Sequence, residues 1–163
     1  MRLREHVILG GVAAVSLYPF FGFWQSLLFW VSAVLIDADH YLDYLWKTKG
    51  KDWSPKAMFK YYDKVTEHMY DKENLGFSLL HTVEIFILVY LLAIEVNYIF
   101  FMTVLAGMLF HLVLDLSYLS YHKVFYVRSF SLFQHSITKK KMRKNGLNHH
   151  NFYKRMFDLS KKA

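Results

Sequence analysis

The distribution of positive charge is the sequence feature that most constrains this chain. All twenty Lys and Arg residues lie outside four apolar stretches, at about residues 7–18, 20–36, 79–95 and 98–116. Two lie at the amino terminus, seven in segment 47–72 and eleven in segment 123–162, whereas the short connections at 18–22 and 95–97 carry none. Cytoplasmic loops of membrane proteins collect Lys and Arg. The pattern therefore predicts four membrane spans in the cytoplasmic (inner) membrane, with both termini on the cytoplasmic side.

Two helical hairpins form the path that fits these stretches. Segment 79–116 is far longer than the roughly 20 residues that one crossing needs, so it must fold back. A single helix over 7–36 would move segment 47–72 to the side opposite the amino terminus, and Pro19 and Gly22 favour a turn instead. The short spans predict a thin contact with the bilayer, tilted hairpins, or polar ends that lie at headgroup level. We expect an all-α integral membrane four-helix bundle that forms one membrane domain over residues 1–163.

Composition supports this class of protein and excludes others. The chain is 55% apolar and 19% aromatic, which is unusual for a soluble basic protein. Its net charge of +7 lies beside the predicted spans, so anionic lipid headgroups are the expected partners, and nucleic acid is not. The absence of Cys excludes disulfides and thiolate metal ligands. Two thin hairpins bury little area alone, which makes a homodimer plausible.

Two cytoplasmic segments have their own character. Ser54 and Pro55 are a typical helix start, and residues 55–70 alternate apolar with charged side chains at helical spacing. This pattern predicts an amphipathic helix that lies in the membrane interface. Residues 123–163 form a basic tail, whose run at 139–144 is interpreted either as a solvated positive flank or as a site for anionic lipid.

Imidazole and carboxylate side chains gather at the predicted cytoplasmic ends of all four spans. Such groups are costly near a bilayer and tend to be functional. His111 and Asp115 are four residues apart, and His81 and Glu84 three apart, so each pair is expected on one helix face. Neutral imidazole with carboxylate suits zinc best, with manganese or iron as alternatives. We expect one or two divalent ions, with these candidate ligands: His6, Asp37, Asp39, His40, His81, His111 and Asp115.

Each group also has a purely structural interpretation. His6 alone is typical of a residue at headgroup level, and segment 37–40 could be an acidic cluster at a helix end. His111 and Asp115 could be a hydrogen-bonded pair that fixes helix packing. The convergence of all these groups in one layer is what favours a metal site.

The order of these residues resembles a known family. An early His6, an Asp-x-Asp-His at 37–40, His81 at the head of a span and a His-x-x-x-Asp at 111–115 resemble the YdjM-like group of membrane-bound metal-dependent hydrolases. Two of these elements also resemble the zinc-dependent phospholipase C and nuclease superfamily. The resemblance covers about residues 6–116. It departs at Ile36, where the family has Pro, and in segment 76–82, which keeps only the second His of a His-Arg-x-x-Thr-His-Ser element.

The resemblance implies a metal-dependent hydrolase, which the predicted topology places at the cytoplasmic face. Because the surrounding Lys and Arg side chains would attract a lipid phosphate and the aromatic side chains would hold acyl chains, we expect a phosphoester, lipid-type substrate. In that reading Glu84 is the general base or a ligand, and Asp39 is a catalytic carboxylate. The alternative is a non-enzymatic scaffold or lipid-binding protein, in which a structural metal or a hydrogen-bonded His/Asp ring holds the bundle together. A proton relay is disfavoured because no charge lies at mid-membrane.

Overall fold

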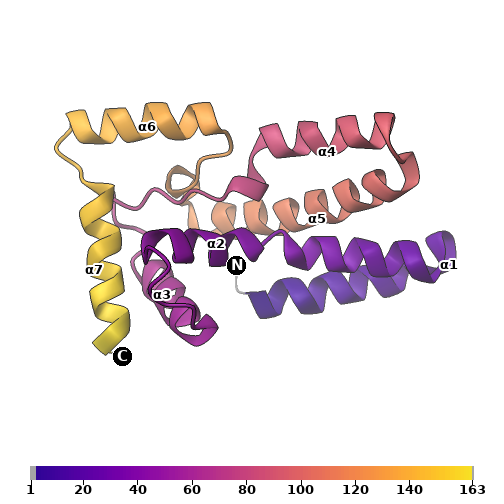
Figure 1. The fold of residues 1–163 in the computed structure, drawn as a ribbon, viewed down its shortest axis with the longest axis horizontal. Coiled ribbons are helices and arrows are strands. Elements are labelled where there is room, and N and C mark those ends of the chain that lie inside the picture. Colours follow the sequence, from indigo (N-terminus) through magenta and orange to yellow (C-terminus); the bar gives the residue numbers. More distant parts are fainter. Residues whose placement is uncertain (1–2, 163) are drawn as a thin grey trace. The chain divides into compact units, whose positions relative to one another are not determined.

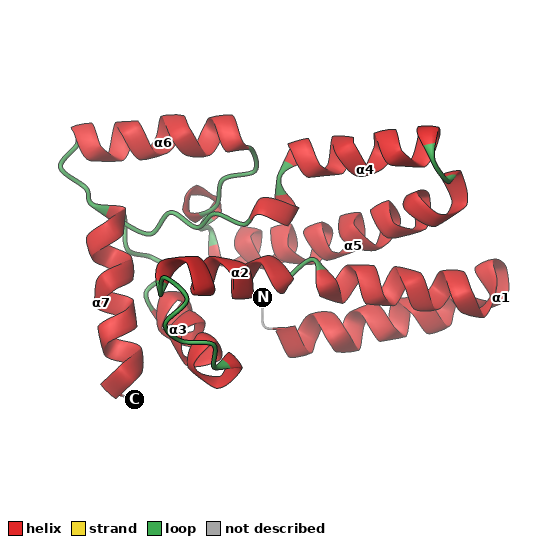
Figure 2. Ribbon diagram, viewed as in Figure 1, coloured by secondary structure: helices red, strands yellow, loops and turns green. Residues whose placement is uncertain are grey.

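The chain is built from helices (Figures 1 and 2). The computed structural model describes residues 3–162, so Arg2, one of the two amino-terminal cations, lies outside the described residues. Within them the only strand-like feature is a single-residue bridge between Gly76 and Arg128, which confirms the all-α class. The elements are α1 (Leu3–Leu35), α2 (Ala38–Lys47), α3 (Pro55–Glu67), η1 (Leu79–His81), α4 (Val83–Glu95), α5 (Tyr98–His122), η2 (Phe125–Val127), α6 (Leu132–Lys144) and α7 (His149–Lys162).

The first hairpin is formed by α1, which folds back on itself (Figure 1). Gly22, with φ of 75° and ψ of 177°, separates an arm at 3–21 from an arm at 23–35, and glycine is the residue that adopts this conformation readily. Trp30 Nε1 on the second arm donates a hydrogen bond to the Val7 carbonyl oxygen on the first, at 2.9 Å. The predicted turn within 7–36 is therefore confirmed, and it lies at Gly22.

The second hairpin consists of α4 and α5. Asn97 begins α5 by accepting a hydrogen bond from the Phe100 backbone N–H at 3.0 Å, the usual role of an N-cap asparagine. The two predicted spans have different bounds in the structure. Thr82 has an extended backbone that separates η1 from α4, so α4 starts later than the predicted stretch at 79–95. In contrast, α5 continues past 116 and ends before Lys123, which is left-handed.

The described residues form two compact units where the sequence predicts one membrane domain. Unit 1 comprises the chain up to Ala38 together with Leu79–Lys123, and therefore holds both hairpins. Unit 2 comprises Asp39–Ser78 together with the chain from Val124 onward. Each unit is thus assembled from two segments that are distant in sequence.

Unit 1 buries small and polar side chains and exposes large apolar ones. The buried positions of α1 are His6, Gly10, Ala14, Ser26, Phe29, Ser32 and Ala33. Exposed side chains on its two hairpins include Val12, Val15, Phe20, Trp24, Ile87, Leu91, Ile94, Leu109 and Val113. Ile36, Phe86, Leu105 and Met108 form a small apolar core between the second arm, α4 and α5.

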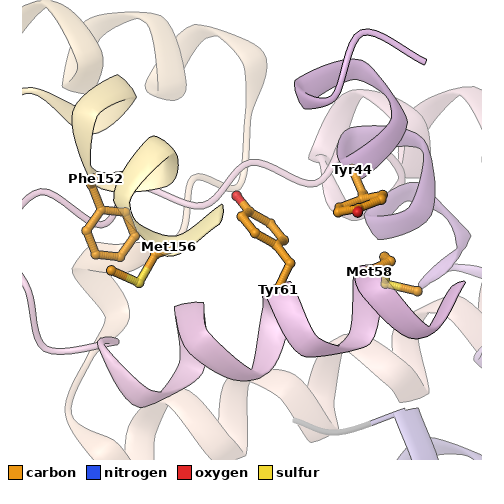
Figure 3. Close-up of a cluster of buried hydrophobic side chains, with 5 residues drawn as sticks. All are labelled: Tyr44, Met58, Tyr61, Phe152 and Met156. Atoms are coloured by element: carbon orange, nitrogen blue, oxygen red, sulfur yellow. The ribbon is translucent and has the colours of Figure 1, made fainter. Parts of the chain in front are cut away.

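Unit 2 has the opposite arrangement, with large aromatic and Met side chains in its interior. Tyr44 of α2, Met58 and Tyr61 of α3, and Phe152 and Met156 of α7 make its core (Figure 3). The Ser54 side chain accepts a hydrogen bond from the Ala57 N–H at 3.3 Å, so the predicted helix start is confirmed. Because the apolar face of α3 packs against α7, that face contributes to the protein interior. The location of segment 55–70 at the membrane surface stays a prediction.

Two helical stretches, Leu3–Lys47 and Tyr98–His122, are long and apolar enough to cross a membrane. The first of them contains the Gly22 break and so supplies two arms rather than one continuous rod. The basic run predicted at 139–144 forms the last turns of α6, where Lys and Arg side chains interact favourably with the helix dipole.

Helices α1 and α5 pack closely at Gly107. A Cβ atom there would overlap the Ser32 hydroxyl and the Phe29 carbonyl oxygen, and would lie 3.1 Å from the Ala33 nitrogen. Backbone atoms cannot move aside as a side chain can. We expect Gly107→Ala to lower the free energy of unfolding by about 1–3 kcal/mol, the usual cost of overpacking, as measured by thermal unfolding in detergent.

The matched control for this prediction is Gly11→Ala. A Cβ at Gly11 meets only the Trp30 ring, at 3.6 Å, an ordinary contact. Alanine is also a better helix former than glycine, so this variant should be unchanged or slightly more stable. Equal unfolding temperatures for the two variants would contradict the close packing of α1 on α5.

Candidate metal centre

Five of the predicted ligands converge within unit 1. They come from four segments that are separated in sequence: His6 in the first arm of α1, Asp37 in the turn after α1, His81 at the end of η1, and His111 and Asp115 on α5. Four of the side chains are at most 5% exposed, whereas Asp37 keeps 12% of its side chain exposed. The fold, and not proximity in sequence, assembles this cluster.

Two groups of three side chains in the cluster have the spacing of ligands around a metal ion: His81, His111 and Asp115, and His6, Asp37 and His111. His111 Nε2 lies 3.4 Å from Asp37 Oδ1 and 3.5 Å from Asp115 Oδ2. His81 Nε2 lies 3.7 Å and 3.9 Å from the same two oxygens, and 3.0 Å from His111 Nε2. Ligand atoms bound to zinc in tetrahedral geometry are about 3.3–3.6 Å apart. The buried His and Asp side chains could therefore hold a metal ion.

His111 is held in the tautomer that a metal ligand needs. Its Nδ1 lies 2.7 Å from the Ala33 carbonyl oxygen, which can only accept a hydrogen bond. A proton is therefore on Nδ1, and Nε2, which faces the two carboxylates, is the nitrogen that could bind a metal ion. Metal-bound histidines commonly use their second nitrogen in this way, because it fixes the ring orientation and raises the basicity of the ligand.

His6 faces the other edge of the same carboxylates. Its Nε2 lies 3.2 Å from Asp115 Oδ1 and 3.9 Å from Asp37 Oδ2, and its ring stacks on that of His111 with 3.8 Å between centroids. Among the described residues, no hydrogen bond reaches either ring nitrogen of this buried side chain. Leaving a buried polar atom unsatisfied costs about 1–3 kcal/mol. A cation bound between His6 and the carboxylates would satisfy Nε2.

The two pairs expected on single helix faces have different outcomes. His111 and Asp115 lie four residues apart on α5 and both point into the cluster, as predicted. His81 and Glu84 do not share a helix, so that prediction is wrong. The Thr82 hydroxyl donates to the Leu79 carbonyl oxygen at 2.8 Å and closes η1, and α4 begins only after Thr82.

Three further predicted site residues lie outside the five-residue cluster. Asp39 and His40 are in α2, which places them in unit 2, where Asp39 Oδ1 lies 4.0 Å from His40 Nδ1. Glu84 lies in the first turn of α4 within unit 1 and is partly buried. The metal-binding roles of Asp39 and His40, and the catalytic roles of Glu84 and Asp39, stay predictions.

Sequence reasoning missed residues that position these groups. The Ala33 carbonyl leaves no signature in a sequence, because every residue carries one. The Tyr62 hydroxyl donates a hydrogen bond to Asp43 Oδ2 at 2.6 Å and lies 3.0 Å from the His40 carbonyl oxygen, which anchors the segment that carries Asp39 and His40. Burial, followed by the charge of Asp43, raises the pKa of Tyr62 well above its usual value, so the phenol stays a donor.

The remaining histidines of unit 2 differ from the cluster in their surroundings. Burial, followed by the nearby charge of Lys139, lowers the pKa of both His135 and His149. These imidazoles are therefore neutral near pH 7 in a strongly basic part of the chain. Neither belongs to a group of described side chains with metal-ligand spacing.

Comparison with known proteins found no family model, curated protein or solved structure that matches the chain.

We expect the purified protein to contain bound transition metal, and Asp115→Asn to lose most of it. Asp115 offers an oxygen to His6 and another to His81 and His111, so its substitution weakens every part of the cluster. Elemental analysis by plasma mass spectrometry measures metal per chain. Asp158→Asn, at an exposed position of α7, is the control and should keep its metal. Equal metal content in both variants, or none in the unmodified protein, would contradict the assignment.

Proposed function

We propose that this chain is an integral membrane protein that hydrolyses a phosphoester, lipid-type substrate with a metal centre at the cytoplasmic face. The observation that carries the proposal is the convergence of three imidazoles and two carboxylates at the ends of two apolar hairpins. The surface of unit 1 supports the membrane location, and the ligand set supports the chemistry.

The surface of unit 1 is suited to lipid. A soluble protein buries large apolar side chains and exposes few of them together. In unit 1 the helices approach through small residues such as Gly107, Ser32 and Ala33, while Val, Leu, Ile and aromatic side chains face outward. Membrane helices pack in this manner, because apolar side chains gain nothing by leaving lipid. Unit 2 of the same chain has an ordinary core, so composition alone does not explain the difference.

The charge distribution supports an orientation with both termini in the cytoplasm. The metal cluster lies at the helix ends remote from the turns at Gly22 and Asn97. Most Lys and Arg residues lie in the segments that come after these helix ends in the sequence, 47–72 and 123–162. This placement follows the positive-inside rule. Anionic headgroups attract basic segments of this kind.

The cluster offers two groups of ligands for a metal ion. His81, His111 and Asp115 would hold an ion in one arrangement, and His6, Asp37 and His111 in the other, with His111 common to both groups. Zinc suits this set best, and manganese or iron would also bind. When bound, such ions lower the pKa of water toward neutrality and polarise a phosphoryl oxygen.

The protein side chains supply the remaining functions. Asp37 is the ligand with the most exposed side chain of the five, so a substrate phosphate would approach from its side. Glu84 and Asp39 are the carboxylates proposed to accept a proton during hydrolysis. The amino-terminal end of α4 follows His81 closely in the sequence. The positive end of the helix dipole lies at that end and favours binding of an anionic phosphate.

A structural metal is the second candidate function, and the depth of the cluster favours it. Four of the five side chains are almost fully buried, whereas catalytic sites keep an open position. In that case the ion would hold the ends of the two hairpins together, and the protein would serve as a scaffold or a lipid-binding protein.

We expect the metal-loaded protein in detergent to hydrolyse a phospholipid or a generic phosphodiester, with activity lost after treatment with a chelator. His111→Ala removes a ligand. Loss of a supporting hydrogen bond to a ligand lowers activity by roughly 10–100-fold, and we expect this variant to lose at least as much. Release of p-nitrophenol or of the lipid headgroup measures the rate, and Asp158→Ala is the control.

The same samples separate the two candidate functions. No activity across ester and phosphoester panels, together with a large fall in unfolding temperature after chelation, would favour the structural metal. Activity that survives complete removal of metal would contradict both candidates.

The topology predicts which positions can be labelled from outside the cell. The chain has no Cys, so single cysteines are unambiguous. Phe21→Cys and Val96→Cys lie at the two turns, are exposed, and should react with a membrane-impermeant maleimide on intact spheroplasts. Lys51→Cys in unit 2 should react only after permeabilisation. Labelling of all three positions only after permeabilisation would show that the hairpins do not cross.

A further inference from the structure

The apolar helices of unit 1 are short for a membrane protein. From Gly22 to Asp37 the second arm of α1 rises about 22 Å, at 1.5 Å per residue, and from His6 to Gly22 the first arm rises about 24 Å. In α4, the stretch between Glu84 and Glu95 is only about 17 Å long. The hydrocarbon core of a typical bilayer is about 30 Å thick.

The apolar part of the longest unbroken helix, α5, is also shorter than the hydrocarbon core of a typical bilayer. From Asn97 to Asp115, α5 rises about 27 Å, and its remaining residues lie beyond the buried carboxylate of Asp115. Any tilt of the helices would shorten the apolar band further, since tilt reduces the height that a helix covers.

Three features fix the height of the apolar surface of unit 1, measured along its helices. The Trp30 indole holds the two arms of α1 in register through the Val7 carbonyl oxygen. Gly107 allows α5 to pack on the second arm without a gap. The cluster of His6, Asp37, His81, His111 and Asp115 holds the polar ends of all the helices at one level. One hairpin cannot slide past the other to cover a thicker layer.

We infer that the exposed apolar surface of unit 1 fits a phospholipid bilayer whose hydrocarbon core is thinner than usual, and that the protein thins an ordinary bilayer around itself. This inference rests on the proposed membrane location. Thinning draws lipid headgroups toward the level of the metal cluster, and so brings a phosphoester within reach of the partly exposed Asp37. The partner is therefore a phospholipid with short acyl chains, or one next to the protein in a deformed layer.

The test uses the full chain reconstituted in phosphatidylcholine vesicles of increasing thickness: dimyristoleoyl, dipalmitoleoyl, dioleoyl and dierucoyl. Circular dichroism measures the unfolding temperature in each. We expect the highest value in one of the two thinner lipids and a fall of several degrees toward dierucoyl. Quenching of tryptophan fluorescence by brominated lipids of the same lengths gives relative binding constants, which should follow the same order; Trp24 and Trp30 are the exposed tryptophans of unit 1.

A matched pair of variants tests whether apolar length is the cause. Glu95→Leu extends the apolar run of α4 and should move the preference toward dioleoyl, whereas Asp158→Leu makes the same chemical change in unit 2 and should leave it unchanged. A maximum in dioleoyl or dierucoyl for the unmodified protein overturns the inference, as does a Glu95→Leu variant with an unchanged preference. Failure to insert into all four lipids would instead contradict the membrane location itself.

Discussion

The interaction on which unit 1 depends is the meeting of Asp37 and Asp115 with three imidazoles at the ends of apolar helices. Burying two carboxylates is costly unless opposite charge or hydrogen bonds compensate them. Their oxygens lie 3.2–3.9 Å from the Nε2 atoms of His6, His81 and His111. This spacing ties four segments together, and a divalent cation bound there would add positive charge between the carboxylates.

The rest of unit 1 is arranged so that this meeting can occur. Gly22 reverses α1 and returns Asp37 to the level of His6, which lies near the start of the same helix. Gly107 brings α5 against the second arm, and that contact places the Ala33 carbonyl oxygen 2.7 Å from His111 Nδ1. The small residues of the interface therefore have two roles: they allow close helix packing, and they orient one of the ligands.

The depth of the cluster and the short length of the helices both affect whether a substrate can reach the metal site. A centre whose side chains are mostly buried needs a way for substrate to reach it, and Asp37 is the ligand that offers one. Headgroups drawn inward by a thinned bilayer would meet the protein at that level. Without such access the same ligands would serve as a structural clamp. Whether the protein is an enzyme or a scaffold therefore depends more on whether a substrate can reach the metal site than on which residues bind the metal.

Several features followed from the sequence alone. The absence of cations from 18–22 and 95–97 predicted two hairpins, and the spacing of His111 and Asp115 predicted a shared helix face, because helical periodicity and charge placement are local properties. Other features depended on tertiary contacts. Thr82 separated His81 from Glu84, the apolar face of α3 found a partner in α7, and a backbone carbonyl fixed the tautomer of His111. Sequence periodicity states which side of a helix is apolar, but only packing decides what that side meets, since the partner comes from a distant segment.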